Sequence, residues 1–291
     1  MIKKNNILLL YFLIFIEILI LFNSKLIVTS VIASSKLFIT KIFPSLFPTM
    51  VIGVCLIKLD VKYIIPKFVY KLFNKLFNFN DSITNLYIIS MLTGTPSNAV
   101  YINKYIEEGL IEEKDATNLL SITHFINPLF VVAGVGLGVF NNAKIGFLLL
   151  IMLYINNFIK AFLNRKNFNF KDKNLNNTKE YNIINALISS IKESISSLLM
   201  ILGIVITFNI LVSLLVNIFN MSYIVNAILN GLLEMTGGII KLSTLNLNKY
   251  LKIFLAYYFL NFGGLCIQLQ AISMLENKKI RYFKYLIFRV L

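Results

Sequence analysis

Two apolar stretches of this chain, each long enough to cross a membrane, are interrupted by residues that break helices. The first interruption is residues 93–98 (Thr-Gly-Thr-Pro-Ser-Asn), and the second is residues 234–238 (Glu-Met-Thr-Gly-Gly). Lipid cannot hydrogen-bond the backbone groups that such a break frees, so a break persists at membrane depth only where protein or a polar cavity receives them. A matched pair of breaks in two halves of a chain is typical of transporters.

The composition places the whole chain in the membrane. Of its 291 residues, 57% are hydrophobic and only 14% are charged, and its mean hydropathy is +0.77. A soluble chain of this length could not keep so much apolar surface from water. The longest polar stretch, near residues 164–179, is too short for a soluble domain. We therefore predict an all-α polytopic membrane protein with a single membrane domain over residues 1–291.

The apolar stretches and their flanks predict the order of the segments. Membrane spans are expected near residues 7–22, 37–57, 117–140, 143–160, 195–219 and 251–275. The interrupted segments, residues 83–106 and 222–248, are expected to form broken or re-entrant helical hairpins between these spans. An amphipathic stretch at 183–197 precedes the second half, residues 1–25 resemble an uncleaved signal anchor, and residues 276–291 form a basic C-terminal tail.

Lysine clusters indicate the orientation of the chain. The net charge of +15 comes from 28 Lys and Arg against 13 Asp and Glu. The basic residues cluster at Lys3 and Lys4, from Lys58 to Lys75, from Lys160 to Lys179, and from Lys278 to Arg289. Such flanks favour the cytoplasmic side, where they meet anionic lipids, so both termini are expected in the cytoplasm. The aromatic residues lie within apolar runs, so nucleic acid is not an expected partner.

All four lysine clusters can lie on the cytoplasmic side if the two hairpins enter the membrane from opposite faces. That arrangement is typical of inverted repeats, here residues 30–160 and 183–275. Three short pairs of similar sequence support the duplication because they occur in the same order. The pairs are 48–53 with 198–203, 91–96 with 232–237, and 124–128 with 258–262. The alternative is that the Gly and Pro residues only kink the helices for packing.

The breaks themselves suggest a ligand class. Thr95 is an expected N-cap with Pro96 at the first helical position, and Thr236 is expected to cap the second new helix. Two helix N-termini would then meet near the membrane midplane, where their unpaired N–H groups suit an anion. The apolar stretches contain almost no Lys or Arg, so hydroxyl, amide and backbone groups would have to hold that anion.

Several polar residues in these stretches are candidate site residues. Glu234 is expected either to couple a proton or bind the ligand, or else to make a structural hydrogen bond. His124, Gln268 and Gln270 are candidate cavity-lining residues whose alternative role is hydrogen bonding within the helix packing. The complete set of candidate substrate-binding residues is Thr93, Gly94, Thr95, Pro96, Ser97, Asn98, Asn127, Glu234, Thr236, Gly237, Gly238 and Asn261.

The sequence favours a non-enzyme. Metal catalysis needs companions that a single histidine and two cysteines, Cys55 and Cys266, do not supply, and no acid pair or nucleophile–base pair falls on the apolar stretches. No metal and no cofactor is therefore expected, and no oligomeric state is predicted.

At these motifs the chain resembles a known family, the sporulation integral membrane proteins called YlbJ, from endospore-forming bacteria. The matching segments are 43–48, 92–99, 109–111 with Ala116 and Leu119-Leu120, 127–130, 134–136, and 233–238. The resemblance covers roughly residues 30–275 and extends to the wider group that shares the nucleoside-recognition, or gate, domain.

The resemblance implies a fold similar to the core of concentrative nucleoside transporters and a role in spore formation at a membrane surrounding the forespore. It also implies dipicolinate, a small aromatic dicarboxylate, as the transported anion. The competing hypothesis is a sporulation membrane protein that transports nothing and instead anchors or organises partners.

Overall fold

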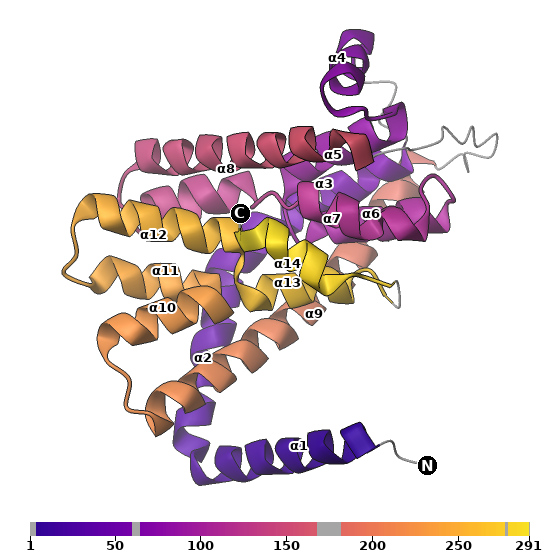
Figure 1. Ribbon diagram of the computed structural model, residues 1–291. Helices are drawn as coiled ribbons and strands as arrows, with labels where there is room; N and C mark the ends of the chain where they lie inside the picture. Colours follow the sequence, from indigo (N-terminus) through magenta and orange to yellow (C-terminus); the bar gives the residue numbers. More distant parts are fainter. Residues whose placement is uncertain (1–3, 60–64, 168–181, 277–278, 291) are drawn as a thin grey trace.

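The computed structural model describes residues 4–59, 65–167, 182–276 and 279–290 (Figure 1). Within these residues the chain is helical, and its only extended pairing is an isolated bridge between Thr95 and Ile126. The first half contains α1 (Lys4–Phe22), α2 (Ser24–Leu37), the π-helix η1 (Phe38–Ile42), α3 (Phe43–Lys58), α4 (Lys67–Phe77), α5 (Asp81–Thr93), α6 (Ser97–Glu107), the 3-10 turn η3 (Glu113–Asp115), α7 (Ala116–Ile122), the π-helix η4 (Phe130–Leu137), α8 (Ala143–Asn164) and the 3-10 turn η5 (Arg165–Asn167). The second half contains α9 (Ile183–Ile218), α10 (Tyr223–Leu233), α11 (Met235–Thr244), α12 (Lys249–Phe262), α13 (Gly264–Ser273) and α14 (Tyr282–Val290).

Four helical segments of the described chain are long and apolar enough to cross a membrane. They are Ser24–Lys58 with 35 residues, Ala143–Asn164 with 22, Ile183–Ile218 with 36 and Lys249–Ser273 with 25. At about 1.5 Å of rise per residue, each exceeds the roughly 30 Å of a hydrocarbon core. An all-α membrane protein is thus confirmed. The expected span at 143–160 falls within one of these segments, and those at 195–219 and 251–275 overlap two others except at their last one or two residues.

Two spans are longer than the sequence predicted because polar residues are accommodated inside them. The span expected at 37–57 starts at Ser24, and the amphipathic stretch at 183–197 is the beginning of the continuous helix α9. Hydroxyl groups bond within the helix packing: Ser34 Oγ donates to the Ser30 carbonyl at 2.7 Å, and Ser30 Oγ donates to Ser213 Oγ of α9 at 2.9 Å. Hydroxyls paired in this way do not interrupt an apolar helix.

The span expected at 117–140 is not one helix. α7 ends at Ile122, the chain is non-helical through the segment 123–127, and a helix resumes at Pro128 and widens into η4. The unwinding expected at Asn127 is therefore present. The corresponding break in the second half lies at Gly263, between α12 and α13.

The π-helix η1 allows a proline to stand within a long helix. Pro44 has no N–H, and in a regular helix its ring would crowd the carbonyl of residue 40. The chain widens instead over Phe38–Ile42, where the Phe43 N–H donates to the Phe38 carbonyl five residues back. Ser45 Oγ donates to the carbonyls of Lys41 at 3.0 Å and Ile42 at 2.9 Å, within the same helix.

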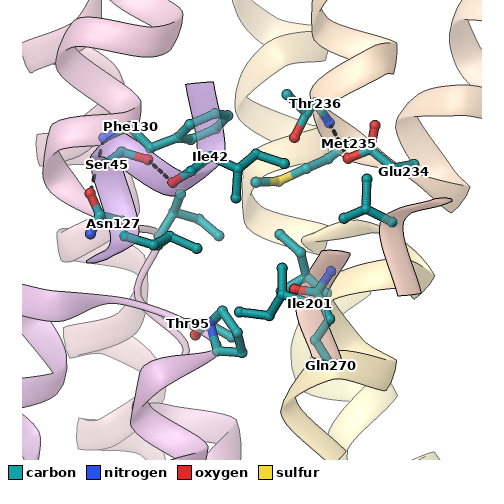
Figure 2. A pocket seen from close by; sticks show the side chains of 15 residues that line it. Ile42, Ser45, Thr95, Asn127, Phe130, Ile201, Glu234, Met235, Thr236 and Gln270 are labelled. Carbon is teal, nitrogen blue, oxygen red and sulfur yellow. Dashed lines mark hydrogen bonds between the residues drawn. The ribbon is translucent and has the colours of Figure 1, made fainter. Parts of the chain in front are cut away.

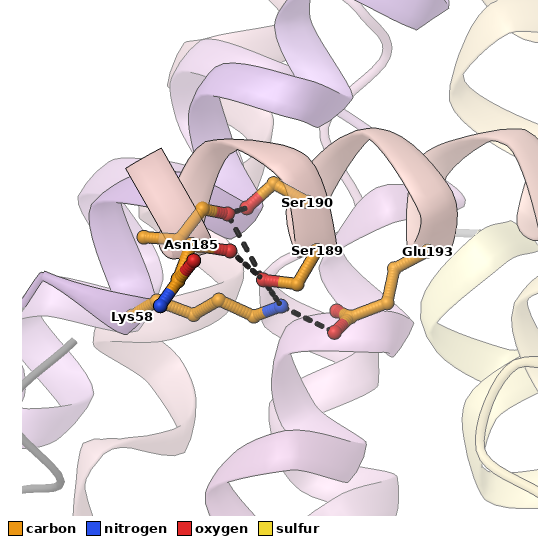
Figure 3. A network of polar contacts seen from close by, with 6 residues as sticks. Lys58, Asn185, Ser189, Ser190 and Glu193 are labelled. Atoms are coloured by element: carbon orange, nitrogen blue, oxygen red, sulfur yellow. Dashed lines mark hydrogen bonds and ion pairs between the residues drawn. The ribbon is translucent and has the colours of Figure 1, made fainter. Parts of the chain in front are cut away.

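The two long helical segments, α2–α3 and α9, contact each other along much of their length. Their contact includes a buried apolar cluster with Met50, Leu198 and Val205. At its end, Lys58 Nζ donates to Ser189 Oγ at 2.7 Å and forms an ion pair with Glu193 (Figure 3). The side chain of Lys58 is only 3% exposed, so this pair joins the end of α3 to the beginning of α9.

The interrupted segments form two helical hairpins, α5–α6 and α10–α11, which lie on opposite sides of the molecule (Figure 1). α14 packs on α7 and α12, and Arg289 near its end is fully buried. This part of the expected basic tail is therefore a packed helix rather than a solvated segment.

Candidate functional site

A cavity of about 40 Å³ lies between the tips of the two hairpins (Figure 2). One water needs roughly 10–15 Å³ of such space, so the cavity holds a few waters at most. Its lining residues are Ile42, Ser45, Leu46, Thr95, Pro96, Ile126, Asn127, Phe130, Ile201, Val205, Glu234, Met235, Thr236, Ile267 and Gln270. The structure therefore brings the two sequence breaks, which are about 140 residues apart, to one place.

The first break is formed by close backbone packing. Gly94 has a φ of 79°, and a Cβ added there would lie 2.4 Å from the Asn127 backbone nitrogen, so only glycine fits. The Thr95 N–H donates to the Phe125 carbonyl at 2.6 Å. The unwound segments 94–96 and 125–127 thus lie directly against each other.

Thr95 does not act as the predicted N-cap. α6 begins at Ser97 with Pro96 in the cap position, and Thr95 Oγ1 has no hydrogen-bond partner among the described residues. The bond from the Thr95 N–H to the Phe125 carbonyl keeps Thr95 outside the helix that follows. Thr95 is 4% exposed and lines the cavity, so its hydroxyl is available to a bound molecule.

Asn127 holds three elements together beside the cavity. Its Nδ2 group donates to Thr49 Oγ1 of α3 and to the Thr93 carbonyl, both at 2.9 Å. Its Oδ1 accepts from the Phe130 N–H at 3.0 Å, which caps the helix that leads into η4. The side chain is 1% exposed, and the structure shows a positioning function for it.

At the second break, Glu234 takes the capping position that was predicted for Thr236. Its carboxylate accepts from the Thr236 N–H at 3.0 Å and from the Gly237 N–H at 2.6 Å. An acidic N-cap is favourable because the carboxylate also meets the positive end of the helix dipole. Thr236 follows two residues later, and its side chain lines the cavity.

The occupied N-terminus changes the electrostatics that the sequence predicted. The N–H groups of α11 were expected to be free for an anionic ligand, but an acid of the chain itself occupies two of them. In the first hairpin, the Asn98 N–H already donates to the Gly94 carbonyl at 3.2 Å. With Glu234 ionised, the cavity would repel an anion.

The two glycines of the second break have different surroundings. Gly238 packs against Gly231 so closely that an added Cβ would lie 2.2 Å from the Gly231 Cα, so α10 and α11 touch backbone to backbone. At Gly237 an added Cβ would meet Glu234 Oε2 at 3.0 Å. Neither glycine lines the cavity.

The other predicted residues lie around the cavity rather than in its wall. Thr93 and Ser97 face the buried hydroxyl of Tyr101, and Asn98 Nδ2 donates to Thr123 Oγ1 at 3.0 Å. Gln268 Nε2 donates to the Phe262 carbonyl at 3.1 Å, which closes the break before α13.

A search of curated proteins gives one significant match. The chain is 22% identical, over 289 aligned residues, to the sporulation integral membrane protein YlbJ of Bacillus subtilis strain 168, covering 86% of this chain and 71% of that protein. The match supports membership of the YlbJ family. No family model matches the chain, and no solved structure does.

The sequence did not single out every residue that lines this cavity. Of the two candidate glutamines, Gln270 lines the cavity and Gln268 does not. Ser45 is a polar lining residue that the sequence did not indicate, and α9 contributes Ile201 and Val205. Ser45 follows Pro44, whose place within a long apolar stretch was the available signal for a distorted helix. The apolar residues of α9 carry no comparable signal, because lipid-facing and cavity-facing side chains look alike in sequence.

Two basic side chains at or beyond the ends of the expected apolar stretches are buried in the structure. Lys160 is 4% exposed, and Arg289 is fully buried. Lys160 Nζ donates to Asn261 Oδ1 at 3.1 Å, and Asn261 Nδ2 in turn donates to the Arg289 carbonyl at 3.4 Å. His124 lies in the same region: its Nδ1 shares a 2.7 Å hydrogen bond with the Tyr285 hydroxyl.

Proposed function

We propose that this protein is a membrane transporter for a small anionic metabolite during endospore formation, and that dipicolinate is its substrate. The observation that carries the proposal is the meeting of two helix breaks at one partly polar cavity inside a membrane protein. The similarity to a sporulation integral membrane protein supports the biological setting. The cavity is too small for a dicarboxylate in this conformation, so transport requires the hairpin tips to separate.

Glu234 couples the anion to a proton in this proposal. An ionised carboxylate beside the cavity opposes an anionic ligand, whereas a protonated one removes that repulsion and can donate a hydrogen bond. An acid at this depth costs a few kcal/mol even on insertion scales, which favours a functional reason for its presence. Thr95 and Gln270 would then bind the neutral and polar parts of the ligand.

The inverted-repeat architecture is part of the same proposal. Each half contains a long helical segment, a broken hairpin and a broken helix, in the same order, at α2–α3, α5–α6 and α7–η4 and then at α9, α10–α11 and α12–α13. This order supports two repeats, at 30–160 and 183–275, related as in the core of concentrative nucleoside transporters.

We further propose that both termini and the 160–179 loop lie in the cytoplasm, that their lysines meet anionic lipids, and that the protein resides in a membrane surrounding the forespore. Most of that loop, from 168 onward, lies outside the described residues. Labelling of single cysteines from either side of the membrane tests the orientation. Outside labelling near Lys171 would contradict it.

Transport is tested with the purified protein in vesicles. We expect uptake of labelled dipicolinate that is driven by a pH gradient, and we expect Glu234→Gln to lower the rate at least tenfold and to remove its pH dependence while the protein still inserts. Lys144→Gln is the control, because Lys144 is exposed at the start of α8. Equal rates with and without the protein would reject transport.

The alternative function is a sporulation membrane protein that organises partners without transport. The small volume of the cavity favours this alternative if the hairpin tips never separate. Two results together would support this alternative. Vesicles that contain the protein would take up no dipicolinate, and a partner protein would co-purify from sporulating cells and be lost when the exposed surface of α1 is changed.

A further inference from the structure

A cluster of basic side chains lies buried outside the cavity. It consists of His124 in the segment between α7 and η4, Lys160 on α8 and Arg289 on α14, and each is at most 4% exposed. None of the three lines the cavity between the hairpin tips. Arg289 lies close enough to both Lys160 and His124 for their charges to interact.

Within the described residues, no carboxylate forms an ion pair with Lys160 or Arg289. Their hydrogen-bond partners are neutral: Lys160 Nζ donates to the amide of Asn261, and Arg289 Nη2 donates to the Ser121 carbonyl at 2.6 Å. Two like charges that are buried side by side without an anion are unfavourable, because each has lost its hydration and the two repel each other.

Several donors of the cluster are also unused. Arg289 Nε and Nη1, and His124 Nε2, are buried without a hydrogen-bond partner in the described part of the chain. When the Tyr285 hydroxyl donates to His124 Nδ1, Nε2 carries the ring proton and becomes a donor. Gly263 leaves Nε2 uncovered, since a Cβ at this position would lie 2.7 Å from it. Buried donors are nearly always satisfied in proteins, so these donors indicate a missing acceptor.

We infer that His124, Lys160 and Arg289 form a binding site for a small oxyanion, a carboxylate or a phosphate. The two positive charges favour a divalent anion, and the unused N–H groups of Arg289 and His124 supply the hydrogen bonds that its oxygens accept. Two asparagines already connect the elements of the site: Asn157 Nδ2 donates to the His124 carbonyl, and Asn261 connects Lys160 to Arg289. A bound anion would add a further link between the break before η4, α8 and α14. This binding site is independent of the proposed transport, so the inference still holds if the uptake assay shows no transport.

The single histidine of the chain gives a direct test. Protein that carries ¹⁵N only in histidine is purified in detergent with chloride as the sole anion, and its imidazole resonances are followed while malonate or phosphate is added at constant ionic strength. We expect a saturable shift of the Nε2 resonance with the oxyanions and none with added chloride. Comparison of malonate with phosphate shows which oxyanion class the site prefers. Resonances that move with neither oxyanion overturn the inference.

Substitutions assign the shift to the cluster. Lys160→Gln is expected to weaken the oxyanion response at least tenfold, whereas Lys144→Gln, on the exposed beginning of the same helix, leaves it unchanged. Glu234→Gln also leaves it unchanged if the site is separate from the cavity. An undiminished shift in folded Lys160→Gln protein overturns the inference. If that variant does not fold, the titration of the unmodified protein still decides whether the oxyanion binds at His124.

Discussion

Asn127 Nδ2 donates to the Thr93 carbonyl at 2.9 Å, so the last carbonyl of α5 is satisfied by a side chain from the next broken helix, 34 residues later. Helix ends leave carbonyls without partners, and in lipid no water can replace them. This bond explains how the first hairpin can end inside an apolar molecule.

Substitution of Asn127 by alanine is expected to destabilise the protein by roughly 2–4 kcal/mol, because three hydrogen bonds disappear and the buried Thr93 carbonyl keeps no partner. Thermal unfolding in detergent measures the loss. Asn185→Ala is the control, since Asn185 is exposed on α9. Equal melting temperatures for the two variants would show that the break is held by packing alone.

Glu234→Ala removes the cap of α11 and is expected to cost about 1–2 kcal/mol of stability, whereas Glu234→Gln retains an acceptor oxygen and costs less. The two variants separate capping from charge. Unfolding midpoints at neutral pH provide the comparison. If glutamine is as damaging as alanine, the ionised carboxylate itself is required for folding.

Thr95→Val is expected to leave stability unchanged or slightly raised, because the buried Thr95 hydroxyl has no partner among the described residues and valine has the same shape. Dipicolinate uptake by the same variant should fall several-fold if the hydroxyl contacts the ligand. Thr207→Val is the matched control, because Thr207 lies on α9 outside the cavity and its exposed hydroxyl donates to the Gly203 carbonyl of the same helix. Normal uptake with unchanged stability would remove Thr95 from the site.

The Lys58–Glu193 pair is expected to contribute to stability because Lys58 is buried, although the 45% exposure of Glu193 weakens the effect. We expect Glu193→Gln to cost about 1 kcal/mol and the double change Lys58→Met with Glu193→Gln to recover part of the loss. Glu112→Gln, which breaks the exposed pair with Lys114, should cause no measurable change. Additive effects of the two changes at Lys58 and Glu193 would argue against coupling between them.

The sequence predicted where the helices break better than how each break is closed. The first break occurs at Gly94 and Pro96, as these residues indicated, and the second occurs at Glu234, at the beginning of the predicted 234–238 interruption, while Gly237 lies inside α11. The cap of α11 was predicted two residues too late, at Thr236 instead of Glu234, because threonine is a common cap and an acid inside an apolar run suggested a proton site instead.

The buried cations show a different limit of prediction. Lys160 and Arg289 lie at the edges of lysine-rich segments, and the positive-inside pattern assigned both to the membrane surface. Their burial follows from the packing of α14 between α7 and α12. Contacts between residues more than a hundred positions apart, such as Lys160 with Asn261, leave no periodic pattern in the sequence.

The two hairpins differ in how firmly they are attached. The tip of α5–α6 is bonded to the segment 123–127 through the Thr95 N–H, Asn98 and Asn127, whereas Glu234 at the tip of α10–α11 bonds only within its own hairpin. The tight contact of Gly231 with Gly238 also makes α10 and α11 a single stiff unit. If the hairpin tips separate, as the proposed transport requires, movement of the second hairpin breaks fewer of these hydrogen bonds than movement of the first. We therefore expect the second hairpin to move while the first stays in place.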